Sequence, residues 1–171
     1  ASSDVGLKII EMIESEYDVI YAHYGHTDIA LKKIKEQFGT KIVLIKDDFS
    51  KEGAGKEIID TIEDYGVWPQ HILHLPAPAA ESVRFSKVSW DDFEQNINIS
   101  VRSAVNILQP ILKTLYKQRQ PGKVIFMLTS YTANLPPKFM TPYITSKYAL
   151  LGLMKSLSCE YADKRIMVNA I

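Results

Sequence analysis

The hydrophobic positions of this chain fall into two patterns that alternate along its length. Short runs rich in β-branched residues, which are typical of buried strands, occur at 18–23, 41–46, 71–75, 123–129 and 166–171. Longer stretches typical of amphipathic helices occur near 4–16, 27–38, 52–65, 91–117 and 143–163. Because strands that alternate with helices require parallel crossovers, we predict an α/β fold with a doubly wound parallel sheet covered by helices on both faces.

Composition favours one domain. The 171 residues are 46% hydrophobic and 23% charged, which suits one core, so we predict a single domain over 1–171. The formal net charge is zero, which gives no electrostatic footprint for nucleic acid or an anionic membrane. The lone cysteine, Cys159, has no partner for an internal disulfide, and no apolar run reaches the roughly 18 to 20 residues that span a bilayer. We therefore expect a cytoplasmic protein.

The first residues, ASSDVGLKIIEMI, form a turn that opens a helix. Small and polar residues lead into apolar positions at helical spacing. Such a turn presents backbone N–H groups that cradle a phosphate, which is one interpretation of the segment. Serine and aspartate before a helix also act as simple N-caps, and the segment alone does not separate the two interpretations.

A serine, a tyrosine and a lysine in the second half of the chain form a second pattern, which favours the phosphate-binding interpretation of the first segment. Tyr143 and Lys147 lie four positions apart near the start of the last helical stretch, and Ser130 lies thirteen positions before Tyr143. This set, in this order of strands and helices, resembles the active site of the short-chain dehydrogenase/reductase family, whose fold is Rossmann-like. The resemblance covers nearly the whole chain, because ASSDVG resembles the end of the family's glycine-rich turn and RIMVNAI resembles its late Val-Asn strand.

The chemistry of the family explains why a phenol and an ammonium stand together. Reduction of a carbonyl by a nicotinamide hydride requires a proton, and an ordinary tyrosine, with a pKa of about 10, is a poor donor near neutrality. The charge of Lys147 would favour the tyrosinate, so that Tyr143 serves as acid or base. Ser130 would hydrogen-bond the carbonyl oxygen, and in the family the lysine also holds the nicotinamide ribose.

The phosphate turn departs from the family pattern. Asp4 replaces the middle glycine, and we expect it to cap the helix. The resemblance then leaves the backbone groups of Ser2, Ser3 and Val5 to bind the pyrophosphate, with Gly6 allowing tight packing.

Two positions in the second half of the chain also differ from the family. Its usual Asn-Asn-Ala-Gly is replaced by LPAPA at 75–79, where Pro76 and Ala77 would line the dinucleotide and the prolines remove N–H donors. The fourth active-site position, usually an asparagine of a proton relay, falls on Ser100. Asn98, two positions earlier on a helix, would point about 200° away.

In the family, residues at the end of the second strand distinguish NAD(H) from NADP(H). Members that prefer NAD place an acidic residue there, whereas this chain has His23, Tyr24 and His26, so we expect NADP(H) rather than NAD(H). These histidines also suit an ordinary polar loop. Asp48 resembles the family's adenine-contacting aspartate, and an Asx turn is the alternative. The spacing of the histidines fits no usual zinc framework, so we predict no metal.

The resemblance implies an oxidoreductase that transfers a hydride between NADP(H) and a small carbonyl or secondary alcohol, similar to the 3-oxoacyl-thioester reductase branch. A dinucleotide-binding regulatory or scaffold protein of the same fold, with weak or no catalysis, stays open because Ser100 and the LPAPA segment depart from the pattern.

The family also predicts assembly and chain ends. Its two long helices, here 91–117 and 143–163, pack across a two-fold axis, so we expect a homodimer or homotetramer. We expect the surplus apolar surface to come from Val105, Leu108, Ile111, Leu112, Leu115, Leu150, Leu151, Met154 and Leu157. Since the family has a strand before Ala1 and a substrate-closing segment after Ile171, we also expect the chain to be incomplete at both ends.

Overall fold

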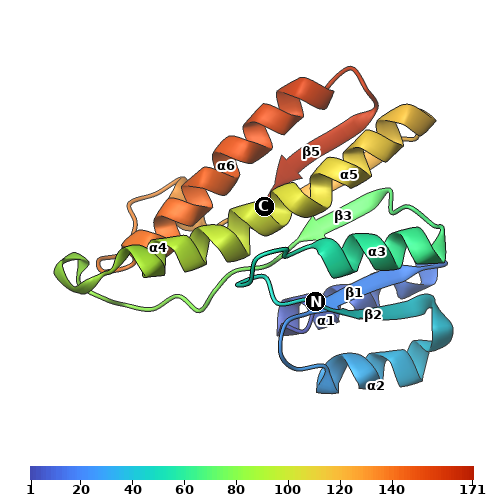
Figure 1. Cartoon of the computed structure of the whole chain (residues 1–171), viewed down its shortest axis with the longest axis horizontal. Coiled ribbons are helices and arrows are strands. Elements are labelled where there is room, and N and C mark those ends of the chain that lie inside the picture. The colour runs from blue at the N-terminus through green and yellow to red at the C-terminus, as the bar shows by residue number, and fades with distance from the viewer. The chain divides into compact units, whose positions relative to one another are not determined.

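The computed structural model describes residues 1–171, which form two compact units, Ala1–Tyr65 and Gly66–Ile171 (Figure 1). A two-stranded sheet lies in the first unit and a three-stranded sheet in the second. All the strand pairs are parallel, which confirms the predicted α/β fold class. The single domain over 1–171 stays a prediction.

The first unit begins with a helix and then alternates strands with helices. Its elements are α1 (Asp4–Ile13), the 3₁₀ turn η1 (Glu14–Glu16), β1 (Ile20–Tyr24), α2 (Ile29–Phe38), the 3₁₀ turn η2 (Gly39–Lys41), β2 (Ile42–Lys46) and α3 (Lys56–Tyr65). The two strands pair from Ile20 opposite Ile42 to Tyr24 opposite Lys46. α2 connects them, because a parallel pair needs a long crossover.

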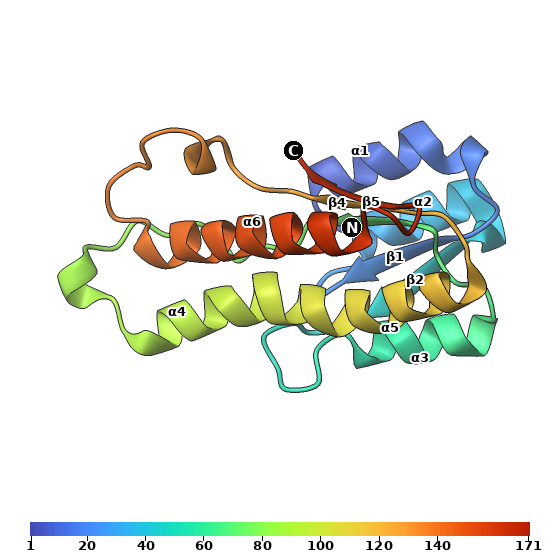
Figure 2. The same ribbon diagram turned by 90° about the horizontal axis from the view of Figure 1, so that it is seen from above.

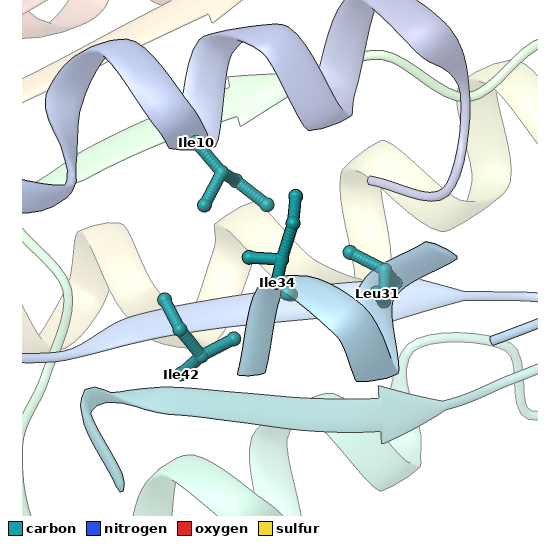
Figure 3. Close-up of a cluster of buried hydrophobic side chains, with 5 residues drawn as sticks. Ile10, Leu31, Ile34 and Ile42 are labelled. Atoms are coloured by element: carbon teal, nitrogen blue, oxygen red, sulfur yellow. The ribbon is translucent and has the colours of Figure 1, made fainter. Parts of the chain in front are cut away.

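Alternation along β1 and β2 divides their side chains between two faces of the sheet. On one face, the strands and helices α1 and α2 bury a cluster made of Ile10, Ala22, Leu31, Ile34 and Ile42 (Figure 3). On the other face, α3 packs against β2, and the Tyr21 and Tyr65 rings meet edge-on with centroids 5.9 Å apart. The pair of strands is therefore covered on both faces, as parallel strands usually are.

The second unit contains the longer helices. Its elements are β3 (His71–His74), the 3₁₀ turn η3 (Phe85–Lys87), α4 (Trp90–Ile97), the π-helical turn η4 (Asn98–Arg102), α5 (Ser103–Gln118), β4 (Gly122–Phe126), the 3₁₀ turn η5 (Ser130–Thr132), α6 (Thr141–Tyr161) and β5 (Ile166–Ala170). The strands lie in the order β3, β4, β5. Since they are parallel, their carboxyl ends lie at one edge of the sheet, where ligands bind in doubly wound folds.

The helices of the second unit pack against one another and against the strands. α6 packs against β5 and α4, and it runs beside α4 and α5 in the same direction (Figure 2). Val124 and Phe126 of β4 are fully buried, and Val124 lies opposite the buried Val168 of β5. The core of this unit therefore lies between the strands and these helices.

The helix predicted over 91–117 is continuous in length but not in hydrogen bonding. Between α4 and α5, the N–H of Ser103 donates to the carbonyl of Asn98, five residues back, which makes η4 a π-turn. Neither proline nor glycine stands within η4, so the sequence offers none of the usual signs of a helix break there.

The expectation of surplus apolar surface on the long helices was mostly wrong. Five of the nine residues are at most 2% exposed and belong to the core, namely Leu108, Ile111, Leu112, Leu115 and Leu150. The exposed or half-buried remainder consists of Val105, Leu151, Met154 and Leu157. These five side chains are therefore part of the core of the unit, and the periodicity of one helix does not reveal how much of its apolar surface the rest of the unit covers.

Candidate functional site

The candidate active site begins in the first turns of α6. Pro142 lies in the first turn, where its missing N–H leaves no helical hydrogen bond broken. Tyr143 and Lys147 follow one turn apart, and the Nζ of Lys147 lies 5.7 Å from the centroid of the Tyr143 ring. A cation so close to an aromatic ring is attracted to its face. The structure therefore brings these two predicted residues together.

Lys147 is buried almost completely. Its side chain is 1% exposed, and Nζ donates a hydrogen bond of 2.8 Å to the carbonyl of Met127, just beyond β4. Burial lowers the pKa of the Lys147 ammonium below its ordinary value, because the charged form loses hydration. An ammonium has three N–H donors, and Met127 supplies one acceptor, so this group has capacity to bind a ligand oxygen.

Ser130 lies farther from the strand than the sequence suggests. β4 ends at Phe126, and Ser130 is the exposed first residue of η5. Two contacts fix this segment: Thr129 caps η5 through its side chain, and the Tyr148 hydroxyl donates 3.4 Å to the carbonyl of Tyr131. Because Tyr148 belongs to α6, η5 is tied to the helix that carries Tyr143.

Ser100 lies in the middle of the π-turn. Its side chain is fully buried, at 0% exposed, and its Oγ has no hydrogen-bond partner within the protein. η4 packs against α6, the helix of Lys147, whereas Asn98 is only half-buried. A buried hydroxyl without a partner is costly, and it marks a place for a water or ligand atom.

His74 is a neighbour of the site that the sequence did not predict. It ends β3, it is 5% exposed, and its Nε2 lies 2.9 Å from the carbonyl oxygen of Ser100. Its ring also meets Phe126 at a centroid distance of 5.7 Å. The sequence offered one sign that the His74 side chain faces the interior. His74 lies three positions after the exposed His71 in a strand, so the two side chains point to opposite faces.

The predicted phosphate turn lies in the first unit. Ser3, rather than Asp4, is the N-cap of α1, and its Oγ accepts the N–H of Gly6 at 3.2 Å. The expectation that Asp4 caps the helix was wrong, because Asp4 is already its first helical residue. A Cβ on Gly6 would lie 2.5 Å from the carbonyl oxygen of Ala1, so only glycine fits. This tight turn at a helix N-terminus fits a dinucleotide phosphate.

His23 is held by the protein itself. Its Nε2 lies 2.7 Å from the carbonyl oxygen of Asp47, and its ring stacks on Phe49 at 4.0 Å and 4°. Since a carbonyl oxygen only accepts, Nε2 carries the hydrogen. Burial lowers the pKa of His23 to about 4, so the ring is neutral near pH 7.

The remaining predicted nucleotide residues lie at loop positions. Asp48 Oδ1 accepts the N–H of Ser50 at 3.0 Å and its hydroxyl at 2.7 Å, which is an Asx turn. These bonds lower the pKa of Asp48. Tyr24 ends β1 and is half-buried, and after β3 the segment with Pro76 and Ala77 has no regular secondary structure.

None of the helices is long and apolar enough to cross a membrane.

Known proteins resemble this chain over most of its length, and the similarity is not confined to the candidate site. A family model described as short chain dehydrogenase matches residues 1–171. A 17-beta-hydroxysteroid dehydrogenase type 3 from Danio rerio is 29% identical over 159 residues, which cover 90% of this chain and 50% of that protein. Glucose 1-dehydrogenase 2 from Bacillus subtilis (strain 168) is 26% identical over 176 residues, covering 100% of this chain and 67% of that protein.

The fold has close counterparts among solved structures. An acetoin dehydrogenase from Enterobacter cloacae superposes with a TM-score of 0.84 at 22% identity, covering 96% of this chain and 65% of that one. The chain thus spans between 50% and 67% of the length of these three proteins. Because the family model matches the whole chain, this chain belongs to the short-chain dehydrogenase/reductase family.

Proposed function

We propose that the protein is an NADP(H)-dependent oxidoreductase that acts on a carbonyl or secondary alcohol. The observation that carries the proposal is the buried ammonium of Lys147, placed beside the Tyr143 ring and bonded to the Met127 carbonyl. Burying an ammonium is costly, and a single carbonyl offsets only part of that cost. A functional role for the charge explains why the cost is accepted.

Tyr143 is the proposed acid and base. In reduction, its hydroxyl donates a proton to the developing alkoxide oxygen, and in oxidation the tyrosinate takes the proton back. The remaining N–H donors of Lys147 suit the ribose hydroxyls of a nicotinamide nucleotide, which supplies or accepts the hydride when bound.

The two serines have supporting roles in the proposal. Ser130, the first residue of η5, would donate a hydrogen bond to the carbonyl oxygen of the substrate and fix its direction. Ser100 would hold a water of the proton relay through the buried Oγ that lacks a protein partner.

For the dinucleotide, we propose the binding residues that the resemblance to the family implies. They are Ser2, Ser3, Val5, Gly6, His23, Tyr24, Asp48, Pro76, Ala77, Tyr143 and Lys147. The preference for NADP(H) rests on His23, which stands where a carboxylate would repel a 2′-phosphate. Its ring is neutral and bonded to Asp47, so it would permit the phosphate rather than attract it.

The substrate is proposed to be a small molecule like those of the 3-oxoacyl-thioester reductase branch. The relatives are named as a hydroxysteroid, a glucose and an acetoin dehydrogenase, and each of these compounds carries a hydroxyl group. This agreement supports carbonyl and alcohol chemistry and leaves the substrate's size open.

A homodimer or homotetramer is also proposed. α5 and α6 form a shallow groove of about 230 Å³, lined in part by Val105, Gln109, Leu153, Leu157 and Tyr161. Val105 is 40% exposed, which suits pairing with a second copy. The exposed thiol of Cys159 suits a reducing compartment and supports a cytoplasmic location.

A second candidate is a dinucleotide-binding regulatory or scaffold protein with weak or no catalysis. The observation that favours it is Ser100, whose short side chain leaves its buried hydroxyl without a protein partner where the family has an asparagine.

The test uses the full-length protein with a panel of 3-oxoacyl thioesters, diketones and ketosteroids. We expect NADPH-dependent reduction of at least one of them, and a Kd for NADPH at least about tenfold below that for NADH, equivalent to about 1.4 kcal/mol. Tight NADPH binding without turnover would favour the second candidate. Absence of dinucleotide binding would contradict both.

A further inference from the structure

Three hydrogen bonds connect Lys147 to Ser100 across the ends of two strands. The Nζ of Lys147 donates a hydrogen bond of 2.8 Å to the carbonyl of Met127. The N–H of Met127 donates a hydrogen bond of 3.0 Å to the carbonyl of His74. The Nε2 of His74 then reaches the carbonyl of Ser100 at 2.9 Å. The two residues proposed for the proton relay are therefore joined by one continuous path of backbone groups and one imidazole.

The imidazole of His74 is the only side chain between the strand ends and the π-turn in this path. A carbonyl oxygen only accepts, so Nε2–H is the donor to Ser100. The ring is 5% exposed and meets the edge of Phe126, which lies opposite His74 in the parallel pair of β3 and β4. Packing and hydrogen bonding thus hold the ring in one orientation.

Two carbonyl groups of the π-turn accept hydrogen bonds from side chains. The N–H of Ser103 donates to the carbonyl of Asn98, so it does not donate to the carbonyl of Ile99 as it would in a regular α-helix. The carbonyl of Ile99 instead accepts a hydrogen bond of 2.6 Å from the Ser103 hydroxyl. The next carbonyl, that of Ser100, accepts from His74. A regular α-helix would satisfy the carbonyl of Ile99 with the N–H of Ser103, and closing the turn by one residue would rotate Ser100 by about 100°.

We propose that His74 is a positioning residue, which holds the π-turn open and fixes Ser100 relative to Lys147. The inference rests on the proposed function for its effect on turnover, while its effect on the π-turn is independent of any activity. His74 contacts neither substrate nor the reacting atoms in this proposal. It acts through the backbone of Ser100.

The test compares two substitutions of His74 in the full-length protein. His74→Gln places an amide N–H near the position of Nε2, whereas His74→Phe keeps a flat ring and removes the donor. His71→Phe is the matched control, because His71 lies on the same strand and is exposed. The readouts are kcat, KM, the Kd of NADPH, and hydrogen exchange of the amides in 98–104.

We expect His74→Phe to lower kcat about tenfold or more, because the buried carbonyl of Ser100 loses the donor on His74. KM and the Kd of NADPH should change less than about threefold. Exchange across 98–104 should accelerate about tenfold or more in the same variant. His74→Gln should restore both properties to within about threefold of the wild type, and His71→Phe should change neither.

Equal effects of the Phe and Gln substitutions, or unchanged exchange across 98–104 in His74→Phe, would overturn the proposal. If His74→Phe does not fold, His74→Leu takes its place with the same expected results. If the wild type lacks turnover, the proposed function fails, and the exchange comparison still decides whether His74 holds the π-turn.

Discussion

The Nζ of Lys147, on α6, donates a hydrogen bond of 2.8 Å to the backbone carbonyl of Met127, just beyond β4. This bond ties the helix that carries Tyr143 to the carboxyl end of the central strand of its sheet. It also holds a charge in a nearly dry position, since Lys147 is 1% exposed. The two consequences, positioning and cost, lead to different predictions.

Tyr143→Phe should reduce turnover by at least about a hundredfold, because it removes the proposed proton donor and keeps the ring beside Lys147. The Kd of NADPH should change less than about threefold, since the hydroxyl is not proposed as a major nucleotide contact. Steady-state kinetics and fluorescence titration measure the two quantities. Turnover like that of the wild type would remove Tyr143 from the mechanism.

Lys147→Met should stabilise the protein without dinucleotide while abolishing its activity. Methionine fills similar volume and needs no hydration, so the free energy of unfolding at pH 7 should rise by about 1 kcal/mol or more. Binding of NADPH should weaken at least about tenfold through loss of the ribose contact. Thermal melts with and without NADPH measure both effects, and a destabilised variant would show that the ammonium contributes to the fold instead.

Ser100→Asn should maintain or raise kcat if Ser100 occupies the relay position, because an amide can bond the groups that the buried Oγ does not reach. Asn98→Ser is the matched control, and it should leave kcat within about threefold of the wild type. A loss of turnover in Ser100→Asn with an unchanged circular dichroism spectrum would place the relay at another residue.

Stability should fall in mild acid because of His23. Its folded-state pKa of about 4 lies below the ordinary value of 6.5, so the unfolded chain binds more protons between these values. The contribution of His23 to the free energy of unfolding is therefore fully present above about pH 6.5. This contribution is lost as the pH falls towards 4, by up to roughly 3 kcal/mol.

Denaturant titrations of the full-length protein between pH 4 and pH 7 measure this loss. His23→Gln should flatten the pH dependence, because glutamine can donate to the Asp47 carbonyl without titrating. Equal slopes in the wild type and His23→Gln would show that His23 titrates normally.

Gly6→Ala should destabilise the protein and weaken NADPH binding at least about tenfold, because the new Cβ would meet backbone atoms that cannot move aside. Gly152→Ala is a control of opposite sign. It lies in the interior of α6 with open space around it, so it should stabilise by about 0.5 to 1 kcal/mol. If Gly6→Ala binds NADPH as tightly as the wild type, the turn is not a phosphate site.

The sequence by itself determined the features that depend on neighbouring residues. Strand and helix periods predicted the parallel α/β class, since alternating and helical patterns follow from local geometry. The pairing of Tyr143 with Lys147 is equally local, because residues four apart on a helix share a face. Even so, local pattern did not separate Ser3 from Asp4 as the N-cap of α1, since both side chains can accept the same N–H groups.

Only the tertiary structure decided the features made by distant residues. The bond between His74 and Ser100 joins positions 26 apart, and it accompanies a π-turn that no proline or glycine announces. Likewise, the burial of His23 against Phe49 and the core positions of Leu108 and Leu115 depend on which elements pack together. Burial and the hydrogen bonds that offset its cost are properties of the assembled layers, so no period along the chain encodes them.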